Sequence, residues 1–144
     1  MNGTDIWKEY GAFLVEDKRG GMDNLTAILT PSKVKADTAV NIREVDGEKY
    51  SSVLTPRNEA RDVTLHFALY NKTQAGWMRK YFEFISFLKK GKDGWLDISL
   101  PQLDLTLHVK YMDSMKFKPL TYLWSEGVHA SKFKVKFREP VPVI

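Results

Sequence analysis

The sequence predicts an α+β domain, mainly an antiparallel β-sandwich or open barrel with one amphipathic helix packed on it. Three segments alternate apolar and polar residues with a period of two, as strands with one buried face do: residues 61–70, 103–111 and 131–138. Residues 74–90 instead repeat their apolar side chains with helical periodicity. Parallel strands buried on both faces would form continuous apolar runs, so the alternation favours an antiparallel sheet.

The composition is that of a folded domain of ordinary size. The chain has 144 residues, of which 43% are hydrophobic, so residues 1–144 are expected to form a single domain with its own core. Its 22 basic and 18 acidic residues leave a net charge of +4, which does not by itself require a nucleic-acid partner. The chain has no cysteine, which excludes disulfides, thiolate-bound metals and a cysteine nucleophile. It has no apolar run of about 18 residues and does not begin like a signal peptide, so we expect no membrane span and no secretion by that route.

In each of the three alternating segments, the apolar side chains are expected to lie on one face. The inward positions are Val63, Leu65, Phe67 and Leu69; Leu103, Leu105, Leu107, Val109 and Tyr111; and Phe133, Val135 and Phe137. Shorter apolar pieces are further strand candidates: residues 11–15, 26–30, 39–43, 94–98 and 115–117. Their ends are expected to shift by a few residues.

The predicted helix covers residues 74–90. Its apolar side chains form a continuous arc when successive residues are placed about 100° apart. The arc consists of Trp77, Met78, Tyr81, Phe82, Phe84, Ile85 and Leu88. Asn71 and Gln74 have the spacing of a capping box, and Gly91 can close the helix in a left-handed conformation. Phe87 lies outside the arc, so it is exposed, covered by another chain, or covered by a loop of its own chain.

Residues 17–61 form the least regular part of the sequence, because glycines, prolines and turn signals separate short apolar pieces. A connection of this length without structure of its own is uncommon unless it is functional, so we expect a long hairpin or an extended arm. If the arm leaves the body, its apolar side chains need cover from a neighbouring subunit. If it folds back, it completes the sheet of its own subunit. The candidate interface residues are Leu25, Ile28, Val40 and Ile42 in this segment, together with Phe87.

The residues that could carry catalysis do not form a recognisable motif. His66 and His108 fall on the polar faces of predicted strands, His129 lies near a turn, and no two have the spacing of a local metal site. Asp97 and Asp104 could meet across a hairpin as the carboxylate pair of a hydrolase, but two surface aspartates at a turn are the simpler interpretation. The sequence contains no nucleophile elbow, phosphate loop or dinucleotide fingerprint. We therefore expect neither an enzyme nor a bound cofactor or metal.

Basic side chains project from the polar face of the last predicted strand: Lys132, Lys134, Lys136 and Arg138. Lys116 and Lys118 could extend this patch, and Lys89, Lys90 and Lys92 form a separate cluster at the end of the helix. A cationic strand face can follow a phosphate backbone, so a small nucleic-acid-binding module is the alternative function. However, the aromatic residues between these cations face the core and cannot stack on bases, and lysines also protect the edges of sheets.

Several short motifs occur along the chain in a definite order. They are Asn2, Gly3 and Asp5, then Tyr10 and Gly11 before a strand, then the arm, then a strand that begins at Arg61, and a helix that ends at Gly91. In these motifs and this order of elements, the chain resembles the N-terminal domain of phage distal tail proteins and the related tail-tube proteins. The resemblance covers nearly the whole chain and implies a β-sandwich with one packed helix. The resemblance does not distinguish among a minimal distal tail protein, a tail-tube-like or adaptor protein, and a prophage relative of either.

The resemblance implies assembly without catalysis. Proteins of this family form rings, commonly of six subunits, around the tail channel, and the arm reaches over the next subunit. It therefore implies a homo-oligomer that contacts other tail proteins, in the virion tail or in the bacterial cytoplasm during assembly. Several candidate sheet edges and a long arm suit such a role, because unpaired edges favour association and a repeated contact between different surfaces can close into a ring.

Overall fold

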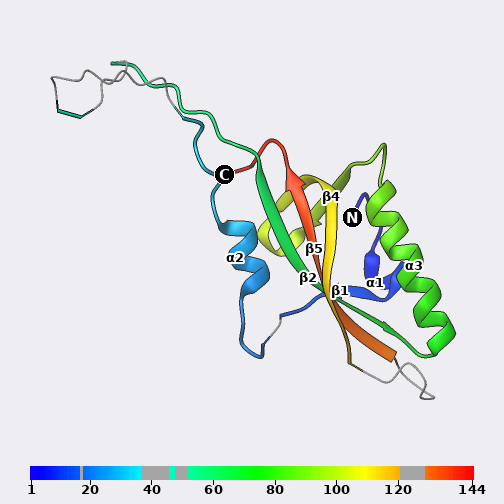
Figure 1. Ribbon diagram of the computed structural model, residues 1–144. Helices are drawn as coiled ribbons and strands as arrows, with labels where there is room; N and C mark the ends of the chain where they lie inside the picture. Colours follow the sequence, from blue (N-terminus) through cyan, green and yellow to red (C-terminus); the bar gives the residue numbers. More distant parts are fainter. Residues whose placement is uncertain (17, 37–45, 48–51, 121–128) are drawn as a thin grey trace.

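The protein is built around one five-stranded antiparallel sheet (Figure 1). The computed structural model describes residues 1–16, 18–36, 46–47, 52–120 and 129–144. The strands are β1 Ala12–Leu14, β2 Arg61–Asn71, β3 Leu96–Leu100, β4 Leu105–Pro119 and β5 His129–Glu139, and they lie in the order β1-β2-β5-β4-β3. The helices are α1 Ile6–Tyr10, α2 Asp23–Leu29, α3 Gln74–Lys90 and the short 3-10 helix η1 Pro101–Leu103. The predicted α+β class is confirmed as an open, curled sheet, which carries short helices in addition to the predicted one.

The inner face of the sheet carries the core at the positions that the alternation predicts. β2 and β5 pair along their whole length, from Arg61 opposite Glu139 to Asn71 opposite His129, so their odd-numbered residues share this face. The predicted inward residues of these two strands are all buried: Val63, Leu65, Phe67, Leu69, Phe133, Val135 and Phe137. The ring of Phe67 lies 5.7 Å from that of Phe84 in α3. Aromatic packing therefore joins the helix to the sheet.

Strand β4 differs from its prediction at both ends. It begins at Leu105 rather than at residue 103, because Pro101–Leu103 form η1 and Asp104 adopts a left-handed conformation with φ of 49°. It continues to Pro119, so residues 115–117 belong to the same strand. The candidates at 11–15 and 94–98 are confirmed with shorter or shifted bounds as β1 and β3, while the candidate at 39–43 lies outside the described residues.

Helix α3 has the predicted bounds, but its start and its apolar face differ from the prediction. The cap is Thr73, whose hydroxyl accepts a hydrogen bond from the Gly76 amide at 3.1 Å. The side chain of Asn71 instead accepts from the Thr73 amide, so the expected capping box is wrong. The buried face is narrower than the predicted arc and consists of Trp77, Phe84 and Leu88, whereas Met78 and Phe82 are exposed.

Helix α3 ends at Gly91 as predicted, but the backbone conformation of Gly91 differs from the predicted left-handed one. Its φ is 47° and its ψ is −138°, which is not the left-handed helical region. A Cβ atom at this position would overlap the carbonyl oxygen of Trp95, and an L side chain rarely adopts this φ. Glycine is therefore required here by both the conformation and the close approach of the next turn.

Residues 23–29 form helix α2, so the predicted strand at 26–30 is wrong. β1 pairs with only three residues of β2, and α2 takes the place of a longer strand beside β2 (Figure 1). The side-chain amide of Asn24 donates to the carbonyl oxygen of Val15 at 2.8 Å and accepts from the amide of His66 at 2.7 Å. One amide side chain thus satisfies main-chain groups that a strand would otherwise pair.

Replacing Asn24 with alanine is expected to lower the free energy of unfolding by about 1–3 kcal/mol, because the partly buried amide of His66 loses its acceptor. Urea unfolding followed by far-UV circular dichroism measures the change. Thr26→Ala is the matched control in the same helix, since its side chain is exposed and the expected change is within about 0.5 kcal/mol. Equal stabilities of the two variants would contradict the role assigned to Asn24.

Helix α1 covers part of α3. Asp5 caps α1 by accepting from the Trp7 amide, and Gly11 ends it in the left-handed conformation. Tyr10 lies with its ring 5.5 Å from the rings of both Phe84 and Phe87. Phe87 is therefore half-buried against the core by its own chain, and its contact with another chain stays a prediction.

Candidate functional site

Within the segment predicted to form an arm, residues 23–29 form α2, and the described residues 31–36 and 52–60 form a two-stranded ribbon. Residues 31–36 and 52–60 run antiparallel to each other, with hydrogen bonds from the Lys35 amide to Arg57 and from the Glu59 amide to Lys33, each 2.7 Å long. This ribbon leaves the sheet and projects away from the body (Figure 1). It carries exposed apolar side chains, among them Val34 and Leu54, which are 50% and 52% exposed. Val40 and Ile42 lie outside the described residues.

A buried ion pair anchors the base of the arm. Arg61 donates through Nε to Glu139 Oε2 at 2.7 Å and through Nη1 to the carbonyl oxygens of Ile28 and Thr30. Glu139 Oε1 accepts from the amide of Val143 at 2.8 Å. One arginine therefore ties the end of α2, the start of β2 and the end of β5 together, which sets the direction in which the arm departs.

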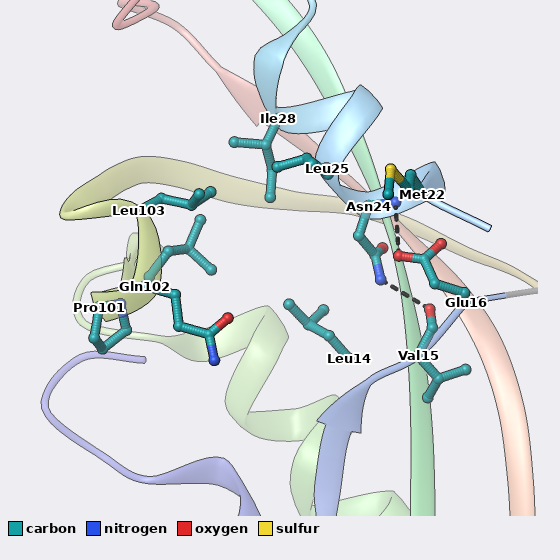
Figure 2. A pocket seen from close by; sticks show the side chains of 11 residues that line it. Leu14, Val15, Glu16, Met22, Asn24, Leu25, Ile28, Pro101, Gln102 and Leu103 are labelled. Carbon is teal, nitrogen blue, oxygen red and sulfur yellow. Dashed lines mark hydrogen bonds between the residues drawn. The ribbon is translucent and has the colours of Figure 1, made fainter. Parts of the chain in front are cut away.

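An open apolar pocket of about 770 Å³ lies between α2, the end of β1 and η1. Figure 2 shows the side chains of Leu14, Leu25, Ile28 and Leu103 around one space. Leu25 and Ile28, two of the candidate interface residues, are thus brought together at this pocket, where Ile28 is buried and Leu25 half-buried. Met22 lines the same pocket and is 66% exposed, so the chain presents apolar surface to solvent here.

The predicted basic residues of β5 do share the outer face of the sheet, but some already have partners. Asp62 of β2 receives Arg138 Nη1 at 3.0 Å and Lys136 Nζ at 3.4 Å. Desolvation would raise the pKa of Asp62, but the hydrogen bonds and charges of Arg138 and Lys136 outweigh it and hold the pKa below its usual value. Because the folded-state pKa is lowered, this stabilisation is present at neutral pH and is lost only as acid protonates the carboxylate.

Asp97 pairs with His108, whereas the other candidate carboxylate, Asp104, lies at a different place in the β3–β4 hairpin. His108 Nδ1 is 2.7 Å from Asp97 Oδ1, and its ring stacks on Trp95 at a centroid distance of 4.7 Å. Asp104 lies instead in the turn after η1, and neither aspartate lines the pocket beside α2. The described ranges contain no group of three or more potential metal ligands, and none of their helices is long and apolar enough to span a membrane. His129 is buried at the start of β5.

No family model matches the chain, and no curated protein matches it. Among solved structures, it is similar to the crystal structure of the SPP1 Dit protein, with a TM-score of 0.58 and 17% sequence identity. The match covers 98% of this chain and 48% of that one. The fold is that of half a phage Dit protein. That protein is described as a paradigm of the hub adsorption apparatus in phages that infect Gram-positive bacteria.

The motif residues behind the sequence resemblance have structural roles in this Dit-like fold. The main-chain amide of Asn2 donates to the carbonyl oxygen of Asp97, and the side-chain oxygen of Asn2 accepts from the main-chain amide of Asp97. Asn2 therefore pairs with the edge of β3. Gly11 closes α1 where a Cβ atom would overlap the carbonyl oxygen of Tyr70. Sequence reasoning missed the pocket and Glu139, because their partners come from distant segments and leave no local pattern.

Proposed function

We propose that the chain is a structural component of a phage or prophage tail, of the distal tail or tail-tube-like kind, that forms or joins a ring. The observation that carries the proposal is the fold likeness along 98% of the chain to the SPP1 Dit protein, the hub protein described above. The proposed partners are further copies of the chain and other tail proteins, and the family resemblance implies six subunits. The proposed locations are the virion tail and, during assembly, the bacterial cytoplasm.

Two different surfaces of the chain suit a contact that repeats from copy to copy. The arm carries exposed apolar side chains away from the body, and the pocket beside α2 offers apolar surface that the chain's own side chains leave open. Burying one large apolar side chain contributes about 1.5–3 kcal/mol, so a few such contacts support association. A contact between unlike surfaces of identical chains closes into a ring when its rotation allows. We therefore assign the ring contact to the arm of one copy and the pocket of the next.

Shortening the arm tests this assignment. Replacing residues 35–57 with Asn-Gly removes the distal arm but keeps α2 and the anchor between Arg61 and Glu139. We expect the mass of the parent protein to rise with concentration from the 16.6 kDa of one chain, while the shortened variant stays at the mass of one chain. Light scattering after size-exclusion chromatography measures both masses, and circular dichroism verifies that the variant is folded.

Two substitutions to glutamate, one at the N-cap of α2 and one within the helix, provide a test with a matched control. Met22→Glu places a charge in the pocket and is expected to weaken association, whereas Thr26→Glu places the same charge on an exposed position outside the pocket lining and is expected to leave it unchanged. An oligomer that survives both the shortened arm and Met22→Glu would overturn the proposed contact. A parent protein that remains a single chain at every concentration would overturn self-association.

A further inference from the structure

A basic hollow of about 370 Å³ lies on the outer face of the sheet and shares Val15 with the lining of the pocket beside α2. The basic side chains that line it are His66, Lys116, Lys118, Lys132 and Lys134. No aspartate or glutamate side chain lines it, and within the described ranges none of these lysines forms an ion pair. Lys132 Nζ donates to the carbonyl oxygen of Glu16 at 3.4 Å. Among the described residues, the hollow therefore concentrates positive charge that no carboxylate neutralises.

The backbone of β4 is irregular at this hollow. Met115 lies opposite Lys134 and Lys118 lies opposite Lys132, so β4 has an extra residue between these pairs. Lys116, inside the irregularity, has a φ of 52°, which a lysine rarely adopts. A bulge redirects side chains, and here both Lys116 and Lys118 line the same hollow. A strained backbone that gathers like charges is unfavourable for folding by itself, and such strain is common at binding sites.

The same face also shows how its cations bind a carboxylate. At the other end of the β2–β5 pair, Asp62 lies opposite Arg138 and contacts both Arg138 and Lys136. Further along β2, the positions opposite Lys134 and Lys132 hold His66 and Ala68, which supply no carboxylate. Lys132 and Lys134 thus repeat the spacing of Lys136 and Arg138, which bind a carboxylate, but the described part of the chain gives them no acidic partner.

We propose that this hollow binds the carboxylates of an acidic segment of another protein chain. Carboxylates form charge-assisted hydrogen bonds with lysine, and a hollow of this size accommodates neighbouring acidic side chains of an extended peptide. A nucleic-acid backbone fits less well, because it would follow β5 beyond the hollow, where Lys136 and Arg138 are already paired with Asp62. The inference does not depend on ring formation, since the lysines that carry it belong neither to the arm nor to the lining of the pocket beside α2.

A fluorescein-labelled peptide of five Glu-Gly repeats is the probe, and fluorescence anisotropy measures its binding at about 50 mM and about 200 mM salt. We expect the parent protein to bind the peptide, more weakly at the higher salt. Lys132→Gln/Lys134→Gln is expected to weaken binding by about tenfold or more, because two charged donors are lost. The matched control, Lys72→Gln/Lys90→Gln, removes the same charge from exposed positions outside the hollow and is expected to change binding by less than about twofold.

The outcomes separate the possible ligands. Equal weakening by the two double variants, or no binding by the parent protein at the lower salt, would overturn the site. Tighter binding of a single-stranded oligonucleotide of equal charge, with the same dependence on Lys132 and Lys134, would assign the hollow to nucleic acid and overturn the proposed ligand. If Lys132→Gln/Lys134→Gln fails to fold, Lys116→Gln/Lys118→Gln tests the same hollow from β4.

Discussion

Replacing Glu139 with alanine is expected to lower the free energy of unfolding by about 3–5 kcal/mol, because it leaves the buried guanidinium of Arg61 without its counter-charge. Glu139 is fully buried, and its second oxygen accepts the Val143 amide, so the substitution also removes a contact to the last residues of the chain. Urea unfolding at neutral pH, followed by far-UV circular dichroism, measures the loss.

Two further variants distinguish a buried charge from a general effect of the substitution. Asp62→Ala removes a carboxylate that also pairs with an arginine but is one-third exposed, and its expected cost is below about 1 kcal/mol. The apolar pair Arg61→Met/Glu139→Leu leaves no charge unpaired and is expected to recover most of the stability lost in Glu139→Ala. If Glu139→Ala costs no more than Asp62→Ala, the buried pair does not anchor the base of the arm.

Replacing Phe84 with alanine is expected to cost about 3–5 kcal/mol, because it opens a cavity between α3 and the sheet. Phe84 is fully buried, and its ring lies within 6.2 Å of the rings of Tyr10, Phe67 and Phe133. The same urea titration measures the change, carried out at a concentration where the protein is a single chain.

Phe82 is the matched control, since it lies in the same helix but is 63% exposed. Phe82→Ala is expected to change the free energy of unfolding by less than about 0.5 kcal/mol. Similar costs for the two phenylalanines would mean that the helix packs on the sheet through a different face.

The sequence predicts those parts of the fold whose side chains meet a single neighbouring layer. β2 and β5 keep a strict period of two because one face of each packs on the core and the other meets solvent or outer side chains. The bounds of α3 follow in the same way from its helical repeat. The width of the buried face of α3 does not follow from this repeat, because the sheet covers Phe84 and leaves Phe82 exposed to solvent.

The errors occur where a distant segment supplies the decisive partner. Residues 26–30 contain apolar and threonine residues that suit a strand, yet α2 forms there because Asn24 bonds to His66 and Val15. Glu16 accepts hydrogen bonds from the first amides of the same helix, seven and eight residues away. Neither contact follows from local periodicity, since each depends on how the chain returns to the edge of β2.

By itself, the sequence determined the class of the fold, the core faces of β2 and β5, the span of α3, the basic outer face and the resemblance to phage tail proteins. These features follow from local order, since alternation and helical repeats are read from neighbours along the chain. Only the tertiary structure decided that α2 completes the edge of β2, that Arg61 and Glu139 are buried together, and that Leu25 and Ile28 line a pocket with Leu103. Each of these joins residues far apart in sequence, and their contacts exist only once the strands have paired and the elements have packed together.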